Sequence, residues 1–480
     1  MNPMTPLWLD RPRAARPSLR GEASYDVVVA GGGIVGLLTG VLLARAGRSV
    51  AVLEARQVGD GTTGHTTAKV SLLQGTKLRR ALSTNPPSVV RDYVAANREG
   101  QAWLREFCTV HGVDHQVRPA YTYASTRAGE LRARAELSVA QLAGLEATWE
   151  EATELPLHVR GAVRLADQMQ LHAMDLLDTL AAELVAEGGD LFEHSRVTDL
   201  HHGASGSEVE TDEARLRARH VVLATGQPVL RRHGFFARLH PQRSYAAALR
   251  SPWAPEGMYL SADQPSRSLR SHPIAGGDEL LLVGGYGHTT GRGEESAHLE
   301  ELLAWARGTF GGEVTHTWSA QDHGTVTGLP YVGPMVPGRH DTWVATGFDK
   351  WGLAAAPAAA LLLTKSILAE HGAGERPPWH RAFSSWTPRE AVGVVRAARY
   401  NVGVGTELTK DVVRRRWRDA ARSERPLSGV CTHLGGAVQW NDAERSWDCP
   451  LHGSRFAEDG SVLEGPAVCG LKKLDPKAGD

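Results

Sequence analysis

Cysteine is scarce in this chain, which has only four among 480 residues, at positions 108, 431, 449 and 469. So few cysteines exclude a secreted fold built on disulfides and fit a reducing compartment, where clustered Cys and His more often bind metal. An excess of charge is also missing, because 53 Lys and Arg residues face 54 Asp and Glu residues. This balance argues against nucleic-acid binding and against adsorption to a membrane surface.

Long hydrophobic runs are absent as well. The longest, residues 352–364 (GLAAAPAAALLLT), contains a proline and is too short to span a bilayer. The first 21 residues contain neither the apolar core of a signal peptide nor a twin arginine. We therefore expect a cytoplasmic protein without a transmembrane segment. The hydrophobic content of 42% can fill ordinary cores, and the length favours about three domains.

A strand, a glycine-rich turn, a helix and a second strand are predicted in succession between residues 25 and 56. The apolar run at 27–30 is typical of a fully buried parallel strand, and 49–53 is a second such run. A GxGxxG pattern follows the first strand directly, and residues 35–46 then have the composition of a helix. This order is the context that a dinucleotide-binding fingerprint requires.

Each residue of the fingerprint has a physical role. Gly31 permits the tight turn, Gly33 lets the backbone approach a pyrophosphate, and Gly36 lets helix and strand pack closely. The phosphates would bind at the N-terminus of the helix, where free N–H groups and the helix dipole favour anions. Glu54, at the end of the second strand, can accept hydrogen bonds from ribose hydroxyls and disfavours the 2′-phosphate of NADP. The alternative is a glycine-rich turn without a ligand.

Further strands and loops rich in glycine, threonine or serine are spread along the chain, at 59–75 (GDGTTGHTTAKVSLLQG), 188–200, 218–229 (ARHVVLATGQPV) and 341–353 (DTWVATGFDKWGL). Together with the opening fingerprint and with RSY at 243–245, this arrangement resembles the D-amino-acid oxidase superfamily of FAD-dependent oxidoreductases. The resemblance covers about residues 5 to 385 and is carried most specifically by the fingerprint, GTTGHTTAK, RSY and TGFDKWG.

The resemblance implies an α/β (α+β) architecture, in which a discontinuous, Rossmann-like FAD-binding domain carries an inserted mixed-sheet substrate domain. It places residues 347–352 beside the flavin ring, and Val197 can present its backbone to the adenine. The cofactor-binding residues expected from the fingerprint and the resemblance are Gly31, Gly33, Ile34, Val35, Gly36, Glu54, Ala55, Thr62, Thr63, His65, Thr66, Thr67, Val197, Thr225, Gly226, Gly347, Phe348, Lys350, Trp351 and Gly352.

The catalytic candidates follow from the same resemblance. An amine-oxidising flavoprotein of this kind typically holds a substrate carboxylate with Arg, Tyr or Lys, because a planar guanidinium matches a carboxylate bidentately. Arg243, Tyr245 and His288 are our candidates, with Arg270 as a further one; a surface role is the alternative for each. The resemblance places Lys350 near the pyrimidine edge of the flavin, where a cation would stabilise the reduced, anionic form. A solvated lysine is the alternative there.

Three other residues bear on the flavin site. His65 and Lys69 belong to the loop after the second strand, from which we expect cofactor contacts. Thr327 stands where relatives often carry an aspartate before Gly-Leu-Pro, so this chain lacks an acidic group at that place.

The C-terminal part contains the pattern Cys431-x-His433 and, fifteen residues later, Cys449-x-x-His452. Two short loops with one Cys and one His each fit a Rieske [2Fe-2S] cluster, in which two cysteines hold one iron and two histidines the other. The sequences CTHLGG and CPLHGS, and the segment 460–468 after them, resemble the Rieske family. The alternatives are a Cys2His2 zinc site, although zinc fingers have a different ligand spacing, and vestigial loops without a cluster.

Two departures from the Rieske pattern stand out. Respiratory Rieske proteins carry a bridging disulfide between the loops, and the corresponding positions here are Gly436 and Leu451. This resembles ferredoxin- and oxygenase-type centres, at the low end of a range of roughly −150 to +300 mV. The preceding segment, 405–429, is rich in Arg and lacks strand alternation, so part of the usual β base is expected to be shortened or lost. Cys108 and Cys469 are not expected to be ligands.

The expected organisation is an N-terminal extension (1–24), an oxidoreductase unit (25–385), a linker or shortened base (386–426) and a small all-β Rieske-like domain (427–476). Within the oxidoreductase unit, we expect FAD-binding parts at about 25–90, 160–235 and 335–372, and a substrate domain at about 95–160 and 240–330.

We predict an FAD-dependent oxidoreductase, similar to an amine or amino-acid dehydrogenase, that oxidises a small molecule. Because reduced flavin carries two electrons and the cluster accepts one at a time, electrons would pass singly through the cluster to an acceptor protein or a quinone. Two alternatives remain. Electrons could enter through the cluster and reduce a substrate at the flavin, or the protein could be a redox sensor without turnover.

Overall fold

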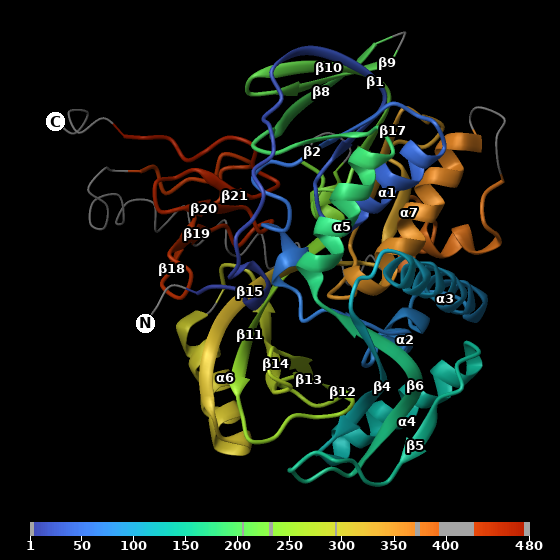
Figure 1. Ribbon diagram of the computed structural model, residues 1–480, viewed down its shortest axis with the longest axis vertical. Helices are drawn as coiled ribbons and strands as arrows, with labels where there is room; N and C mark the ends of the chain where they lie inside the picture. Colours follow the sequence, from blue (N-terminus) through green and yellow to red (C-terminus); the bar gives the residue numbers. More distant parts are fainter. Residues whose placement is uncertain are drawn as a thin grey trace.

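The computed structural model describes residues 4–203, 206–229, 234–292, 295–369, 375–392 and 427–474. These residues form three sheets, of eight, nine and four strands (Figure 1). The predicted α/β fold with an inserted mixed sheet and a small C-terminal all-β domain is confirmed.

The eight-stranded sheet has the core order β16-β17-β10-β1-β2-β7, and β9 and β8 extend it from β10. Its strands β1, β2, β7, β10 and β17 run parallel, as the buried apolar runs predict. The bounds are β1 Gly21–Ala30, β2 Val50–Leu53, β7 Asp190–Phe192, β8 Val197–Gly203, β9 Gly206–Thr211, β10 Ala214–Leu223, β16 Tyr331–Pro334 and β17 Thr342–Thr346.

Three helices pack beside this sheet: α1 Ile34–Arg45, α5 Ala173–Ala186 and α7 Gly352–Ala369 (Figure 1). A fourth, α3 Pro87–Val110, packs on α7. Of the helices in the described ranges, α7 alone is long and apolar enough to cross a membrane, with a mean hydropathy of 1.6 over 18 residues. Because 72% of that window is buried inside the protein, α7 has the character of a core helix.

The nine-stranded sheet is mixed and has the order β15-β11-β14-β13-β12-β4-β6-β3, with β5 paired to β6. Its strands are β3 Lys69–Val70, β4 His115–Ala124, β5 Thr148–Glu150, β6 Gly161–Leu171, β11 Leu239–Arg250, β12 Met258–Ser261, β13 Arg267–Pro273, β14 Glu279–Thr289 and β15 Glu313–Thr325. The remaining α-helices are α2 Lys77–Leu82, α4 Arg127–Leu142 and α6 Glu295–Phe310. Helix α6 packs on β11 and β14, and α4 packs on β4 and β6.

The third sheet is an antiparallel ribbon of β18 Gln439–Asn441, β19 Ser446–Asp448, β20 Arg455–Ala457 and β21 Val462–Glu464. Its small core contains both cysteines of the predicted cluster site, together with Leu451 and Phe456. The segment 405–429, for which we expected a shortened base, lies outside the described residues up to position 426.

The N-terminal segment packs onto the oxidoreductase unit. The indole of Trp8, in the 3-10 helix η1 (Leu7–Leu9), is fully buried and donates a hydrogen bond to the carbonyl oxygen of Thr66. The ring of Trp8 also meets His172 and His272 edge-on. This segment therefore supports the glycine- and threonine-rich loop, which contains the 3-10 helix η2 (Thr62–His65).

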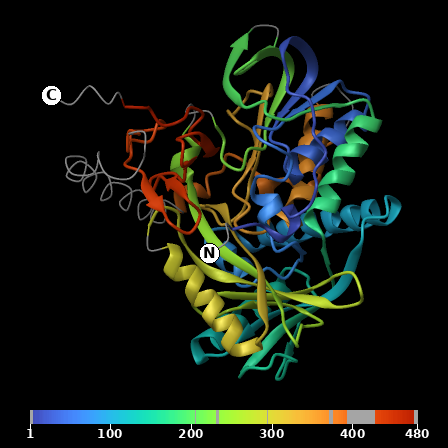
Figure 2. The same cartoon turned by 60° about the vertical axis from the view of Figure 1, so that its left-hand side comes forward.

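The C-terminal ribbon lies beside the place where the two large sheets meet. Figures 1 and 2 both show it next to the eight-stranded sheet on one side and to β11 and β15 on the other. The 3-10 helix η3 (Phe235–Arg238), which leads into β11, is part of this boundary. A further short segment, the 3-10 helix η4 (Pro378–Phe383), packs against α3 and β16.

Candidate active site and cluster site

The glycine-rich turn after β1 is packed so tightly that side chains are excluded. A Cβ on Gly36 would lie 1.9 Å from the carbonyl oxygen of Gly31, and a Cβ on Gly31 would lie 2.5 Å from that of Ala224. Gly31 also has a φ of +110°, which L side chains rarely adopt. The turn thus brings the backbone N–H groups at the start of α1 into an open cavity, as a pyrophosphate site requires.

Glu54 closes the other side of the turn. Its carboxylate accepts hydrogen bonds from the backbone N–H groups of Gly32, at 2.8 Å, and of Arg56, at 2.9 Å. Burial raises the pKa of Glu54 even though these two N–H groups favour the charged form. The carboxylate is fixed at the cavity wall, where it can accept hydrogen bonds from a ribose.

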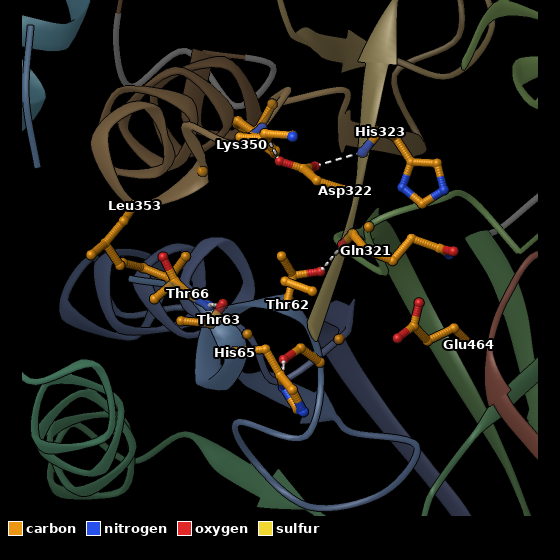
Figure 3. A pocket seen from close by; sticks show the side chains of 18 of the residues that line it. Thr62, Thr63, His65, Thr66, Gln321, Asp322, His323, Lys350, Leu353 and Glu464 are labelled. Carbon is orange, nitrogen blue, oxygen red and sulfur yellow. Dashed lines mark hydrogen bonds between the residues drawn. The ribbon is translucent and has the colours of Figure 1, made fainter. Parts of the chain in front are cut away.

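A cavity of about 400 Å³ runs from this turn to the mixed sheet (Figure 3). All the residues predicted to bind the cofactor line it, apart from Gly36 and Gly347. Gly36 lies beneath the turn, and Gly347, with a φ of +77°, packs against Thr325. Since the glycine cradle, the ribose acceptor and the threonine-rich loop face one elongated cavity, the residues present fit an FAD.

The mixed sheet supplies the far end of the cavity through Ser244, Tyr245, Ala246, Leu260, Ser266, Ser268, Gly284, Gly285 and Gly287. Lys69, on β3, also lines this end. Its Nζ donates to the carbonyl oxygen of Tyr259, at 3.0 Å, and to the hydroxyl of Ser268. Burial, helped by the charge of Arg270, lowers the pKa of Lys69 to about 7. Lys69 therefore places an amine with a lowered pKa inside the cavity.

Lys350 follows β17 in a turn with unusual backbone angles. Asp349 and Lys350 have φ values of +54° and +69°, which are uncommon for residues other than glycine. Side chains hold this turn in place: the Asp322 carboxylate accepts the backbone N–H of Lys350, and the Asp349 carboxylate binds Lys77 at 3.0 Å. Figure 3 shows Lys350 beside Asp322. The Lys350 ammonium donates to the Ser244 hydroxyl, and burial lowers its pKa to about 8.

Two predicted arginines lie outside the cavity lining. The Arg243 guanidinium is 1% exposed and donates to both carboxylate oxygens of Glu444, at 2.7 and 2.8 Å. Arg270 is fully buried and donates to the backbone carbonyl oxygens of Thr67 and Ala68. Both positions differ from the substrate-binding role expected from the sequence, because each guanidinium is engaged by groups of its own chain.

The other two predicted catalytic residues form a pair. The Tyr245 hydroxyl lies 3.1 Å from Nε2 of His288, and the two rings are stacked. Tyr245 lines the cavity, whereas His288 lies behind it. Thr327 is 2% exposed, and its carbonyl oxygen accepts hydrogen bonds from the side chains of Thr84 and Asn85. Thr327 is therefore part of the packed interior and does not line the cavity.

The two loops of the predicted cluster site have the same hydrogen-bonding pattern. In the first loop, the carbonyl oxygen of Cys431 accepts a hydrogen bond from the N–H of Gly435, and the N–H of Cys431 donates to the carbonyl oxygen of Gly436. In the second, Cys449 makes the equivalent bonds with Gly453 and with residue 454. The same pair of backbone hydrogen bonds therefore closes both loops.

The four predicted ligands lie at the buried ends of these loops, the two thiols as one pair and the two imidazoles as another. Cys431, His433, Cys449 and His452 are between 2% and 7% exposed, and the imidazole centroids are 5.3 Å apart. Both thiols are free, and the hydrogen bond from Cys449 lowers the pKa of Cys431 to about 6. Among the described residues, no three Cys, His, Asp or Glu side chains converge as ligands of one ion. This donor set fits a cluster with two irons better than a single zinc.

Gly436 and Leu451 lie against each other between the loops. A Cβ on Gly436 would lie 2.5 Å from Cδ1 of Leu451 and 3.2 Å from Sγ of Cys449. The loops are therefore held together by apolar packing at the place of the disulfide that respiratory Rieske proteins carry.

The C-terminal ribbon also supplies part of the cavity wall, a feature that the sequence did not reveal. Leu463, Glu464 and Gly465 line the cavity, and Figure 3 shows Glu464 near Gln321 and His323. The guanidinium of Arg196 donates to the carbonyl oxygen of Val462 at 2.9 Å. No local pattern could have signalled these contacts, because the residues that meet are more than 130 positions apart in the chain.

The fold and the two sites together define an oxidoreductase with an FAD cavity and an attached iron–sulfur domain. Family models agree: residues 26–366 match the FAD-dependent oxidoreductase (DAO) family, and residues 406–475 match the Rieske [2Fe-2S] domain. The chain belongs to the DAO family of FAD-dependent oxidoreductases and carries a C-terminal Rieske domain. The oxidoreductase part binds FAD, and the Rieske domain binds a [2Fe-2S] cluster.

Individual proteins resemble the whole chain or one part of it. The putative Rieske 2Fe-2S iron-sulfur protein YhfW of Bacillus subtilis is 31% identical, over 96% of this chain and 95% of its own. The crystal structure of glycine oxidase from Geobacillus kaustophilus has a TM-score of 0.64 at 22% identity, covering 76% of this chain and 98% of that one. The cytochrome b6-f complex iron-sulfur subunit 3 of a Nostoc species is 55% identical over 42 residues, 9% of this chain and 24% of its own.

Proposed function

We propose that this protein is an amine or amino-acid dehydrogenase, which oxidises a small molecule at FAD and passes the electrons singly through the Rieske cluster to an acceptor protein or a quinone. The observation that carries the proposal is the shared wall between the two sites. Residues of the Rieske domain line the FAD cavity, so FAD bound there would lie against that domain. Bound FAD would supply the hydride-accepting chemistry.

The ionisable groups that line the cavity indicate how a substrate carboxylate would be held. Among the described residues that line it, guanidinium groups come only from Arg56 and Arg196, at the end where Glu54 and Val197 lie. At the mixed-sheet end, the ionisable groups are Lys69, Lys350, Tyr245, Asp322 and His323. A substrate carboxylate would therefore be held by an ammonium group and not by the bidentate arginine expected from the sequence.

The two lysines also suit proton transfer. Burial lowers the pKa of Lys69 to about 7 and that of Lys350 to about 8, which is close to the operating range of a general base. A substrate ammonium must lose a proton before its C–N bond can be oxidised, and Lys69 lies in the cavity to accept it. Lys350 in its charged form would stabilise the negative charge of reduced FAD, the role predicted for it from the sequence.

A relative of the larger part supports the proposed direction of electron flow. A glycine oxidase is a relative at 24% identity over 74% of this chain, which supports oxidation of a C–N bond as the source of electrons. The domain boundaries predicted from the sequence belong to this proposal: oxidoreductase unit 25–385 and Rieske domain 427–476. So does a cytoplasmic location, which the free cysteines favour.

An anaerobic screen tests the function. The purified protein, loaded with FAD and cluster, is mixed with amines and amino acids, and the flavin absorbance and the EPR signal of the reduced cluster are recorded. A substrate is expected to bleach the flavin and then to reduce the cluster. The variant Cys449→Ser serves as the control, since its flavin is expected to bleach without any cluster signal. If no amine or amino acid bleaches the flavin, the proposal is wrong.

A further inference from the structure

A hydrogen bond joins the wall of the FAD cavity to the second ligand loop of the Rieske domain. Gln321, on β15, lines the cavity, and its Nε2 donates to the carbonyl oxygen of Gly453 at 2.8 Å. Gly453 directly follows the ligand His452. The contact is close, because a Cβ on Gly453 would lie 2.6 Å from Cβ of Pro241 and 3.1 Å from Nε2 of Gln321. We propose that Gln321 is the bridging residue through which FAD and the cluster exchange electrons.

The histidine side of the cluster site faces the flavin domain. The ring of Phe236, in η3, meets His433 and His452 edge-on, with centroids 5.2 and 4.9 Å away. The two imidazoles are 4% and 7% exposed. A histidine face covered in this way cannot dock an external redox protein directly. It is therefore available for exchange inside the chain, and the outer acceptor must approach the cluster from another side.

On the cavity side, Gln321 is anchored to the cofactor loop. Its carbonyl oxygen accepts a hydrogen bond from Oγ1 of Thr62, at 2.7 Å (Figure 3). The path from the cavity to His452 thus consists of the Gln321 side chain, one hydrogen bond and the backbone of Gly453. Electronic coupling decays more slowly along such a path than across a gap of the same length, so this contact favours transfer at this point of the boundary.

The inference rests on the proposed function, because it takes reduced FAD as the donor. Each passage moves one electron from reduced FAD to a ferric iron of the cluster, which becomes ferrous. Two passages return FAD to its oxidised form, and its protons go to water. Between the passages, the cluster gives its electron to a one-electron acceptor, a protein or a quinone.

The test uses the full-length protein loaded with FAD and cluster. Gln321→Met keeps the length of the side chain and removes the donor to Gly453. The flavin is reduced by a light flash without substrate, and reduction of the cluster is followed by its absorbance and by freeze-quench EPR. We expect transfer to slow by about tenfold or more, a size typical for the loss of an outer-shell hydrogen bond at a metal site, because the path must then cross a gap. The EPR spectrum of the reduced cluster should remain that of the unchanged protein.

Arg292→Met is the matched control. The Arg292 guanidinium lies 3.4 Å from the carbonyl oxygen of Pro450 in the same ligand loop, but Arg292 does not line the cavity. We expect transfer in this variant at the rate of the unchanged protein. An unchanged rate in Gln321→Met, or equal slowing in both variants, would overturn the inference. Because the flash replaces the substrate, failure of the amine screen leaves this result unaffected, and the two proposals fail separately.

Discussion

Arg243 of β11 and Glu444 of the turn between β18 and β19 form a buried ion pair across the boundary between the flavin and Rieske domains. The guanidinium is 1% exposed and the carboxylate side chain 11% exposed, with 2.7 Å between Nη1 and Oε1. Arg455 also binds Glu444, and Glu464 lies near both arginines. Burial raises the pKa of Glu444, but the two arginines outweigh it and keep that pKa below its ordinary value.

Removal of Arg243 should therefore destabilise the folded protein. In Arg243→Met, Glu444 loses one of its two buried cations, and breaking such a pair costs about 3–5 kcal/mol. The matched control is Arg445→Met, which removes the pair with Glu458, whose side chains are 69% and 59% exposed. That exposed pair should contribute at most about 1 kcal/mol. Denaturant unfolding followed by tryptophan fluorescence measures both; equal small effects would show that the buried pair does not hold the domains together.

Gly36 should be indispensable for FAD binding. A methyl group at this position would lie 1.9 Å from the carbonyl oxygen of Gly31, so Gly36→Ala must displace the turn that faces the pyrophosphate. We expect Gly36→Ala to be purified without FAD, as measured by the flavin released per chain on denaturation. The control is Gly308→Ala in α6, where a Cβ meets no atom within 4 Å. This control should keep its FAD and gain about 0.5–1 kcal/mol of stability from its helical position.

The two cysteines of the Rieske domain that lie in the ligand loops should be distinguishable from the one that does not. Cys449→Ser removes a buried thiol at the predicted iron site, and we expect loss of the cluster with retention of FAD. Cys469→Ser changes an exposed thiol and should keep both cofactors. Iron and sulfide content and the EPR spectrum of the reduced protein provide the measurement. A full cluster in Cys449→Ser would rule out the proposed ligand set.

Lys69 should make stability depend on pH. Burial lowers its pKa from 10.5 to about 7 in the folded protein. Between these values the unfolded chain binds one more proton at Lys69 than the folded one, so this residue makes stability rise with pH across that window. Below about pH 7 both states are charged, and the folded state bears the full cost of the buried ammonium.

The variant Lys69→Met should remove this contribution. The difference in thermal unfolding temperature between Lys69→Met and the unchanged protein should be largest in favour of the variant near pH 6 and should shrink toward about pH 10. Lys365→Met, at a side chain that is 42% exposed, is the control and should give a difference that does not change with pH. A flat difference for Lys69→Met as well would mean that Lys69 is not buried as an amine.

Local patterns predicted much of the fold. The strand, turn, helix and strand expected at 27–30, 31–36, 35–46 and 49–53 correspond to β1, the glycine turn, α1 and β2. Such elements are readable because apolar runs, glycines and caps act over a few neighbouring residues. The resemblances to the DAO and Rieske families were equally local in origin, and both are confirmed.

The contacts of individual side chains could not be predicted from the sequence. Arg243 was expected to hold a substrate carboxylate, and the structure gives it the carboxylate of Glu444, which is 201 positions away. Gln321 and Glu464 carried no recognisable signal, yet both line the cavity. A sequence pattern specifies that an arginine is a suitable carboxylate ligand, but it does not specify which carboxylate reaches it.

By itself, the sequence determined the two cofactors, because the residues that bind each of them lie in short segments. These segments are the glycine-rich turn, which has no room for side chains, and two loops with one Cys and one His each. Only the tertiary structure decided how the two sites are related. Packing of the C-terminal ribbon against β11 and β15 places the imidazoles against Phe236 and Gly453 against Gln321. That arrangement depends on contacts between distant segments, whose geometry is fixed by shape and buried charge and not by any local pattern.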